Sequence, residues 1–524
     1  MPQTPPPESL PQLCLLILAD IHYVHHAKSA SPIPARRSEL GRELVRRACE
    51  RARQLMKLDA VLMMGDLVDD GTAAGAREDL TELWEELRRP GLPVVVVRGN
   101  HDADLDAAPE ARGQVACRVE IGGYQFVIFT DPYDPQDRST RSDAALRAVR
   151  EAAVAQPDRP IIALQHNPIH PPIESDYPFM PTNRDAIMAA YREAGVLLSI
   201  SGHYHGGQSL SHEGGVGYVT APALCEHPFC FLLVRLQGRE VHIEEHHLAL
   251  SSDRATPSLY VDHHCHTQFA YCRDDITATE AIRRAEEFGV AKLYLTEHAG
   301  QLYLNEQDYW GAAFLSDPDC YARERAAGRG RMDDYRRMVE PLRSDRVGLG
   351  LEVECDGAGR LTLLPQDADG WDVLVGAVHV VPELLAAHPD PGQVKREFMQ
   401  FTETLLRRKV DILAHPFRLF RRAKLPVPAE LFAPVADLLA EHGVAAEINF
   451  HINRESLEFI AMCLQRGVRI TFGSDAHGLW EVGALWPHVE LLEAACVRVA
   501  GGSATQGAGC PPEAGGDPAR PQRR

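Results

Sequence analysis

Five clusters of potential metal ligands stand at or near the ends of short apolar runs in the first half of the chain. They are Asp20-Ile21-His22, Gly65-Asp66, Gly99-Asn100-His101-Asp102, His166 and Gly202-His203-Tyr204-His205. Carboxylate, amide and imidazole groups together suit manganese, iron or zinc ions, and glycine lets the backbone turn sharply beside an ion. Any one of these histidines alone is best explained as a structural residue. Five clusters in series instead predict a metal site.

The second half of the chain carries a similar series, which begins with Asp262-His263-His264-Cys265-His266-Thr267. His264 and His266 alternate along an expected strand, so both point to one face and can share an ion. Further candidates follow later apolar runs, namely His298, Glu352, His379, His415, Asp475 and His477. This series predicts a second metal cluster.

Strands must bring the first series together. The apolar runs that predict them are Leu13–Ala19, Val61–Met64, Val94–Val97, Phe126–Thr130, Ile161–Leu164 and Val196–Ile200. Between two of the runs, residues 36–57 carry an apolar stripe at three- and four-residue spacing, which predicts a packed helix. Such alternation indicates a layered α/β domain. Ligands at the carboxyl ends of its strands converge at one edge of the sheet.

A second set of strands is predicted after a polar stretch at residues 251–258. Its runs are Leu259–Val261, Lys292–Leu295, Val347–Leu351, Val373–Val378, Ile412–Ala414, Ala445–Ile448 and Arg469–Phe472. At 524 residues the chain exceeds what one hydrophobic core usually supports. We therefore expect a flexible N-terminus (1–12), a first domain (13–250), a linker (251–258), a second domain (259–500) and a disordered tail (501–524).

The composition limits the classes of partner and the cellular location that the sequence predicts. A formal charge of -20 argues against a nucleic acid partner. The Pro-rich start lacks the features of a signal peptide, and every apolar run is shorter than the roughly 20 residues that cross a bilayer. Twelve cysteines without a CxxC pair favour reduced thiols over a disulfide framework. These features predict a cytoplasmic protein that does not bind membranes.

Over residues 13–248, the motifs from Gly65-Asp66 to Gly99-Asn100-His101-Asp102 resemble the calcineurin-like metallophosphoesterase family. The resemblance implies a four-layer α/β sandwich with two metal ions, either Mn, Fe or Zn. It implies one ion held by Asp20, His22, Asp66 and His205, and a second held by Asp66, Asn100, His166 and His203. Asp66 would bridge the ions, and His101, oriented by Asp102, would protonate the leaving group.

Other polar residues lie close to these motifs in sequence. We interpret Asp69, Asp70, His25 and His26 as solvated loop positions, although His25 and His26 could alternatively touch a substrate phosphate. The Asp-x-His spacing and the loop lengths look most like the cyclic-nucleotide phosphodiesterase branch of the family. A phosphodiester substrate would fit that branch.

Over residues 258–497, the second series resembles the polymerase and histidinol phosphatase (PHP) superfamily. The resemblance implies a distorted (β/α)7 barrel with two to three ions of Zn, Mn or Fe at its mouth. It assigns His264, His266, Glu352 and Asp475 to one ion. It assigns His298, His379, His415 and His477 to the others, with Glu352 as the bridge.

The second series departs from the family at one position. Histidinol phosphatases often place a histidine six residues beyond the second motif histidine, where this chain has Cys272. Cys272 is a candidate ligand that would favour softer metals, with Asp274 or Asp275 as oxygen alternatives. Glu447 is interpreted as an outer-sphere or core residue. Arg418, Arg421 and Arg422 form either a phosphate-binding group or a solvated basic turn.

Together the two series predict a bifunctional metal-dependent phosphoester hydrolase that acts on small phosphorylated metabolites or nucleotides. A diester opened by one domain and a monoester cleaved by the other would make the reactions sequential. In one alternative, one domain is catalytic and the other is a metal-containing sensing or assembly module. A nuclease is another alternative, which the net charge disfavours.

Overall fold

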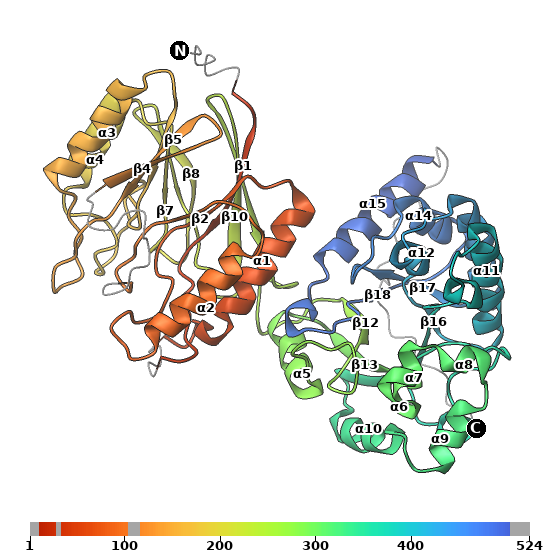
Figure 1. Ribbon diagram of the computed structural model, residues 1–524. Coiled ribbons are helices and arrows are strands. Elements are labelled where there is room, and N and C mark those ends of the chain that lie inside the picture. Colours follow the sequence, from red (N-terminus) through yellow and green to blue (C-terminus); the bar gives the residue numbers. More distant parts are fainter. Residues whose placement is uncertain (1–9, 28–32, 103–115, 503–524) are drawn as a thin grey trace. The chain divides into compact units, whose positions relative to one another are not determined.

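The computed structural model describes residues 10–27, 33–102 and 116–502 (Figure 1). The chain divides into two compact units, 1–248 and 249–524. The expected flexible N-terminus lies outside the described residues except for 10–12, and the expected tail except for 501–502. No helix in the described part of the chain is long and apolar enough to span a membrane.

Two sheets form the centre of the first unit. The five-stranded sheet has the order β11-β10-β1-β2-β3, with β1 at Leu13–Leu18, β2 at Ala60–Met63, β3 at Val94–Val96, β10 at Cys230–Gln237 and β11 at Glu240–His247. The six-stranded sheet has the order β4-β5-β6-β7-β9-β8, with β4 at Ala116–Ile121, β5 at Tyr124–Phe129, β6 at Ile161–Leu164, β7 at Leu198–Ser201, β8 at Gln208–Glu213 and β9 at Val216–Thr220. β1, β2 and β3 run parallel, as do β5, β6 and β7. Their carboxyl ends therefore carry the loops with the candidate ligands.

Helices cover the outer faces of both sheets. α1 (Gly41–Leu55) and α2 (Ala76–Arg88) flank the five-stranded sheet, whereas α3 (Asp143–Ala155) and α4 (Arg184–Ala194) flank the six-stranded sheet (Figure 1). Val149 of α3 and Tyr191 of α4 are buried in one cluster with Val127 of β5. The four-layer α/β sandwich is thus confirmed.

The second unit is a closed barrel of parallel strands. They are β12 (Val261–Cys265), β13 (Lys292–His298), β14 (Val347–Val353), β15 (Val373–Gly376), β16 (Ile412–Leu413), β17 (Ala445–Asn449) and β18 (Ile470–Gly473). Every predicted run of this half overlaps one strand, and the (β/α)7 barrel is confirmed. The first run ends at Val261, where β12 begins, because buried polar residues such as His264 interrupt its apolar pattern.

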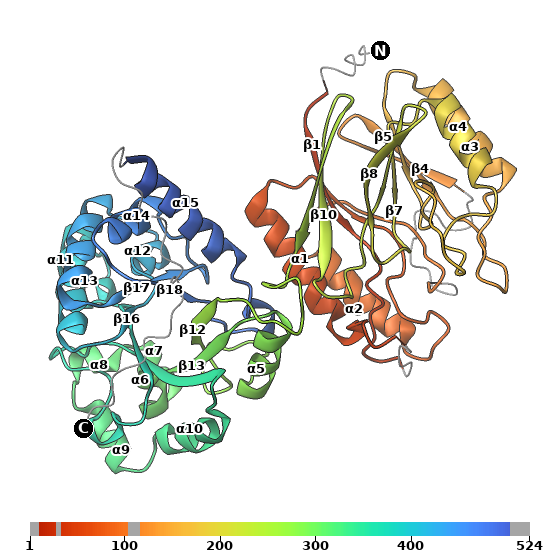
Figure 2. The same cartoon turned by 180° about the vertical axis from the view of Figure 1, so that it is seen from behind.

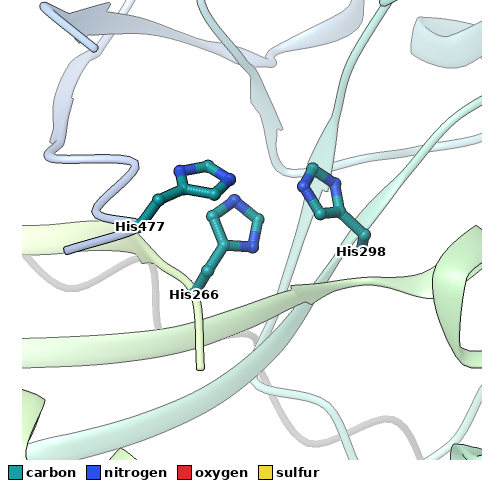
Figure 3. Close-up of side chains that lie close together, drawn as sticks. All are labelled: His266, His298 and His477. Atoms are coloured by element: carbon teal, nitrogen blue, oxygen red, sulfur yellow. The ribbon is translucent and has the colours of Figure 1, made fainter. Parts of the chain in front are cut away.

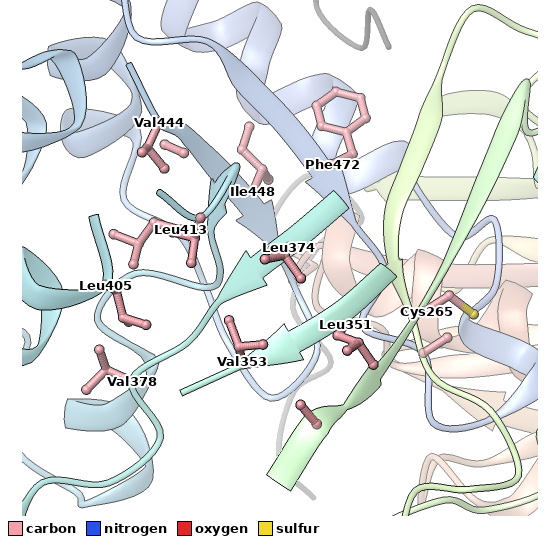
Figure 4. Close-up of a cluster of buried hydrophobic side chains, with 14 of the residues drawn as sticks. Cys265, Leu351, Val353, Leu374, Val378, Leu405, Leu413, Val444, Ile448 and Phe472 are labelled. Atoms are coloured by element: carbon pink, nitrogen blue, oxygen red, sulfur yellow. The ribbon is translucent and has the colours of Figure 1, made fainter. Parts of the chain in front are cut away.

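Helices surround the barrel (Figure 2). They are α5 (Ala278–Glu287), α6 (Ala299–Tyr303), α7 (Glu306–Trp310), α8 (Ala313–Ser316), α9 (Cys320–Ala326), α10 (Met332–Val339), α11 (Pro391–Arg407), α12 (Arg418–Arg422), α13 (Phe432–His442), α14 (Leu457–Gln465) and α15 (Trp486–Gly502). Strand residues such as Leu351 and Leu413 pack outward against helix residues such as Leu405 (Figure 4). Alternate strand residues, including Val373 and Val375, fill the barrel interior. The barrel strands are buried on both faces, which explains why most of them stand out in the sequence as continuous apolar runs.

The segment expected as a linker is attached to the second unit at both ends. The Leu250 amide donates to the Phe288 carbonyl at 2.8 Å, and the Ser258 amide donates to the Gly289 carbonyl at 2.9 Å. Residues 252–257 between these bonds are all exposed. The segment is therefore an accessible loop with fixed ends.

The cysteines follow the expected reduced state with one departure. Ten cysteines of the described residues are free thiols, and nine of these are buried. Cys496, in contrast, is disulfide-bonded. The expectation of reduced thiols throughout is therefore wrong for Cys496.

Candidate metal centres

The first unit brings its predicted ligands together around Asp66. Its Oδ2 atom lies 3.6 Å from His22 Nε2 and 3.2 Å from His166 Nε2. Asp66 is fully buried between these two imidazoles. This position suits a carboxylate that bridges two ions.

One group of ligands lies on each side of Asp66. On one side, His22 Nε2 is 3.3 Å from His205 Nε2, which is 3.8 Å from Asp20 Oδ1. On the other side, His166 Nε2 is 3.1 Å from Asn100 Oδ1, and the potential ligand atoms of Asp66, His166 and His203 lie within 4.8 Å of one another. All seven predicted metal ligands of this half therefore lie in one cluster.

Tight backbone packing holds the loops that carry this cluster. Asp102 accepts hydrogen bonds from the amides of Asp66, Leu67 and Gly99 at 2.9 to 3.0 Å. A Cβ atom on Gly99 would lie 2.0 Å from Asp66 Oδ1, so only glycine fits there. The Asp102 carboxylate is fully buried, and burial raises its pKa to about 6. Asp102 thus fixes two ligand loops to each other.

The expected orientation of His101 by Asp102 is wrong. The His101 Nδ1 atom lies against the Asp69 backbone carbonyl, because the Asp102 carboxylate is turned toward the backbone amides. The His101 ring meets the His22 ring edge-on at a centroid distance of 4.6 Å. His101 also lines the pocket in front of the cluster, which is the position that a proton donor to a leaving group requires.

The imidazoles are fixed through their outer nitrogens. His166 Nδ1 is 2.7 Å from the Met64 carbonyl, and His205 Nδ1 is 2.6 Å from Glu226 Oε1. Each Nε2 atom is therefore left to face the cluster, as in many metal sites. His203 Nε2 is buried without a hydrogen-bond partner in the described part of the protein. Such an atom fits a metal ligand, because an unpaired buried nitrogen is otherwise costly.

The pKa shifts of two histidines in the first cluster show how each could take part in metal binding. Burial lowers the pKa of His22 to about 4, so its ring is neutral and available as a ligand. Burial alone would lower the pKa of His166, but the Asp66 carboxylate outweighs it and raises the pKa to about 10. Metal binding at His166 would therefore displace a proton.

One of the neighbouring polar residues, Asp69, differs from expectation. Asp69 is not solvated: it is buried, and its Oδ1 lies 3.2 Å from Arg36 Nη1. The same Arg36 nitrogen is 3.3 Å from His22 Nδ1. The sequence interpretation missed Arg36, since no ligand motif marks it.

The remaining neighbouring residues stay outside the ligand cluster. His25 and His26 are exposed, and each lies 3.0 Å from a carboxylate oxygen of Glu82. Asp70 is partly buried and lines the pocket. The Asp70 carboxylate accepts exposed hydrogen bonds from Thr72, so the solvated interpretation holds for Asp70, His25 and His26.

The pocket of the first site has a volume of about 890 Å³. It is lined by Arg36, His101, Asp137, Tyr177, Phe179 and Tyr204, among others. Its outer part is aromatic, whereas its floor contains Asp66 and His203. The pocket therefore offers separate places for a phosphate and for an apolar group.

Glu352 of β14 occupies the centre of the barrel cluster. Its carboxylate oxygens lie 2.5 Å from His298 Nδ1, 3.2 Å from His379 Nε2 and 3.0 Å from His415 Nε2. Burial alone would raise the pKa of Glu352, but the surrounding histidines hold it well below its usual range. Its place among the imidazoles suits the bridging role that the resemblance implies.

The other predicted ligands of the barrel complete the cluster. Asp475 Oδ1 lies 2.9 Å from His266 Nε2 and 3.6 Å from His264 Nε2. His266 stacks on His298 at a centroid distance of 4.1 Å and lies 4.3 Å from His477 (Figure 3). The potential ligand nitrogens of His266, His298 and His477 lie within 4.8 Å of one another. The barrel mouth therefore gathers histidines from β12, β13 and the loop after β18.

Cys272 lies at the edge of this cluster. Its Sγ atom is 3.5 Å from His298 Nε2, and its side chain is exposed. Of the oxygen alternatives, Asp275 accepts a hydrogen bond from the Leu479 amide at 2.8 Å. The structure thus places the thiol, rather than Asp275, next to a candidate ligand.

Carboxylates surround the imidazoles of the barrel. Glu447 Oε1 is 2.9 Å from His264 Nδ1, and Glu297 Oε1 is 3.2 Å from His266 Nδ1. Glu447 is therefore an outer-sphere residue, one of the two interpretations of the sequence. His264 Nε2 points inward and has no hydrogen-bond partner among the described residues, so this cluster also fits bound cations.

Two further residues around this site were missed. Glu354 Oε1 holds His379 Nδ1 at 3.0 Å. His451 contacts Glu481 Oε1 at 2.6 Å and stacks on His477 at 4.5 Å. Sequence position could have identified both, because Glu354 follows Glu352 by two residues and His451 stands just after β17.

The arginines after His415 occupy different environments. Arg418 is buried and donates to His415 Nε2 at 2.7 Å, to His379 Nε2 at 3.0 Å and to Asp475. Arg421 and Arg422 are exposed, and Arg422 lines a pocket of about 500 Å³ together with Arg418. The solvated-turn alternative is therefore wrong for Arg418.

Comparisons with known proteins agree with both units. Residues 15–207 match the family model of the calcineurin-like phosphoesterases, and residues 262–451 match that of the PHP domain. Serine/threonine-protein phosphatase CPPED1 from Danio rerio is 26% identical over 185 residues, which cover 32% of this chain and 60% of that protein. The chain thus spans about three fifths of this curated relative.

Solved structures give weaker similarities. A dimetal phosphatase from Danio rerio is 17% identical, with a TM-score of 0.37, and the match covers 45% of this chain and 96% of that chain. A protein assigned as a histidinol phosphatase from Listeria monocytogenes is 13% identical, with a TM-score of 0.29 over 43% of this chain and 97% of that chain.

Proposed function

Because the chain joins a calcineurin-like phosphoesterase domain to a PHP domain, we propose that it is a bifunctional metal-dependent phosphoester hydrolase. One observation carries the proposal: each unit contains a complete cluster of candidate ligands, so neither site borrows a residue from the other. The substrates are small phosphorylated metabolites or nucleotides.

The first site would hold two ions through the ligands on either side of Asp66. When bound, divalent ions supply an activated water and neutralise phosphoryl charge. Arg36 lines the pocket beside Asp69 and would bind a phosphate oxygen. His101 would donate a proton to the leaving oxygen from a ring held by the Asp69 carbonyl.

The second site would hold two to three ions around Glu352. Arg418 and Arg422 reach the same pocket and would orient the phosphate, since guanidinium pairs well with its oxygens. Glu447, Glu297 and Glu354 would keep the ligand imidazoles in the required tautomers.

One contact in the barrel must change when metal binds, whether the barrel is catalytic or a metal-containing sensing module. Arg418 donates hydrogen bonds to the Nε2 atoms of His379 and His415, and these imidazole nitrogens would otherwise bind an ion. Arg418 must therefore leave these nitrogens when metal binds.

A phosphoester panel tests the proposal on the full chain, on an Asp66→Ala chain and on a Glu352→Ala chain, with metal content measured on each sample. We expect each variant to lose the activity of one domain only. A Glu352→Ala chain that keeps the complete activity profile would favour the sensing alternative for the barrel.

A further inference from the structure

Exposed apolar side chains gather at the two pockets. In the described part of the chain, the exposed large apolar residues are Ile33, Val154, Tyr177, Leu259, Trp310, Leu385, Ile452 and Val497. Ile33 and Tyr177 line the first pocket, and Trp310, Leu385 and Ile452 line the second. Single exposed apolar residues are ordinary, but their concentration beside two charged clusters indicates ligand recognition.

An aromatic wall leads outward from the first cluster. Phe179 lies 5.5 Å from the candidate ligand His203 and 4.7 Å from Tyr177, measured between ring centroids. The Tyr177 side chain is 40% exposed. The Tyr177 ring itself lies 5.6 Å from the His203 ring, so the wall places a partly exposed ring directly beside the cluster.

The second cluster has a wall of the same kind. Tyr309 lies 6.2 Å from the candidate ligand His298 and 5.1 Å from Trp310. Tyr309 is buried, whereas Trp310 is 47% exposed. Both sites thus place two neighbouring aromatic rings, one of them exposed, beside a candidate ligand histidine.

A carboxylate connects each wall to its cluster. The Tyr177 hydroxyl donates to Asp137 Oδ2, which also accepts from Asn100 Nδ2 at 3.0 Å. The Tyr309 hydroxyl donates to Glu354 Oε2 at 3.1 Å, and Glu354 Oε1 holds His379 Nδ1 at 3.0 Å. A ring stacked on either wall would therefore take a fixed position relative to the cluster.

We infer that both sites recognise one organic group, a flat heteroaromatic ring such as a nucleobase, carried by the phosphoester. The ring stacks on Tyr177 in the first site and on Trp310 in the second, while Arg36 or Arg418 contacts the phosphate. Stacking suits such a ring because every base offers a π face. The inference rests on the proposed function, and it makes both domains act on nucleotides rather than on sugar phosphates.

Adenosine 5′-monophosphate and ribose 5-phosphate test the inference, since they differ only in the base. Each compound is titrated into two metal-loaded variants of the full chain. The Glu352→Ala variant keeps only the first site intact, and the Asp66→Ala variant keeps only the second. The readout is Kd by calorimetry where no turnover occurs, and KM where it does. We expect adenosine 5′-monophosphate to bind at least about 5-fold more tightly at each site.

Substitutions of the two exposed rings test whether these rings cause the preference for the nucleotide. Tyr177→Ala in the first site and Trp310→Ala in the second should weaken nucleotide binding by about 5- to 100-fold and leave ribose 5-phosphate and metal content unchanged. Tyr177→Phe should keep the preference because it keeps the ring. Val154→Ala and Val497→Ala, which remove exposed apolar side chains far from either pocket lining, are the matched controls.

Equal affinity for the two probes at either site would overturn the shared-ring inference, as would alanine variants that weaken both probes alike. A different result would contradict the proposed function without contradicting ring recognition. If the nucleotide is preferred at both sites but no phosphoester is hydrolysed with any metal, ring recognition stands and the hydrolase proposal falls.

Discussion

The two units place their candidate ligands by different means. In the sandwich, the ligands stand on loops, and Asp20, His22, Asp66 and His203 all have positive φ, between 48° and 67°. In the barrel, His298 and Glu352 lie on the strands themselves, whereas His415 and Asp475 follow strands and have positive φ as well, 29° and 52°. Strained non-glycine residues cost about 1 to 3 kcal/mol each. The sandwich therefore depends on local restraints such as Asp102 for most of its ligands, whereas the barrel obtains part of its ligand geometry directly from the strands.

The surroundings of the two clusters also differ. Three barrel imidazoles face the outer carboxylates Glu447, Glu297 and Glu354. In the sandwich, His166 faces a backbone carbonyl and His205 faces the half-exposed Glu226. His22 of the sandwich also faces a carboxylate, the buried Asp69, at 3.5 Å, and Arg418 adds a buried positive charge to the barrel. The barrel therefore differs in the number of buried carboxylates that orient its imidazoles.

The largest expected effects come from the two bridging carboxylates. Asp66→Ala should abolish metal binding and turnover in the sandwich, and Glu352→Ala should do the same in the barrel, since each removes the residue shared by the ligand groups. Metal analysis and domain-selective substrates measure both. Loss of both activities in either variant would contradict the independence of the domains.

His101→Asn should lower turnover in the sandwich by about 10² to 10⁴-fold if His101 is the general acid. Its ring is not among the predicted ligands, so metal content should stay constant. The loss should shrink for esters whose leaving groups need no proton. An equal loss for good and poor leaving groups would argue against this role.

The outer carboxylates give a direct comparison of the two domains. Glu447→Gln should weaken metal binding in the barrel by about 10- to 100-fold. Glu226→Gln should weaken it less in the sandwich, because Glu226 retains contact with solvent. Competition with a metal chelator measures both affinities, and a larger effect at Glu226 would reverse the proposed contrast.

The smallest effect is expected at Cys272. If its thiolate is a ligand, Cys272→Ser should reduce the preference of the barrel for zinc over manganese several-fold, because thiolate favours soft ions. The ratio of the two affinities is the measurement. An unchanged ratio would remove Cys272 from the ligand set.

The barrel strands after β12 could be predicted because each contains an apolar run buried on both faces, whereas β12 is largely polar. Five strands of the sandwich were not predicted, namely β4, β8, β9, β10 and β11. β8 and β11 are half-exposed and carry no continuous run, whereas β9 and β10 are buried apolar strands that were missed. Asp69 was misinterpreted because its burial depends on Arg36, which lies 33 residues away and belongs to no motif.

The role of Asp102 was equally hidden. The motif places it beside His101 in sequence, but its carboxylate bonds to backbone amides that stand 35 and 36 residues earlier. Sequence spacing thus identified the candidate ligands that lie close together in each half. It did not reveal which side chains hold the ligand loops together.

Cleavage between the domains tests most directly whether each unit is a complete enzyme. A protease site placed within the exposed residues 252–257 would separate units whose cores are independent. After cleavage and separation, we expect each fragment to retain its own metal ions and phosphoesterase activity. Fragments that lose both and recover them only on mixing would show one composite centre and contradict the account.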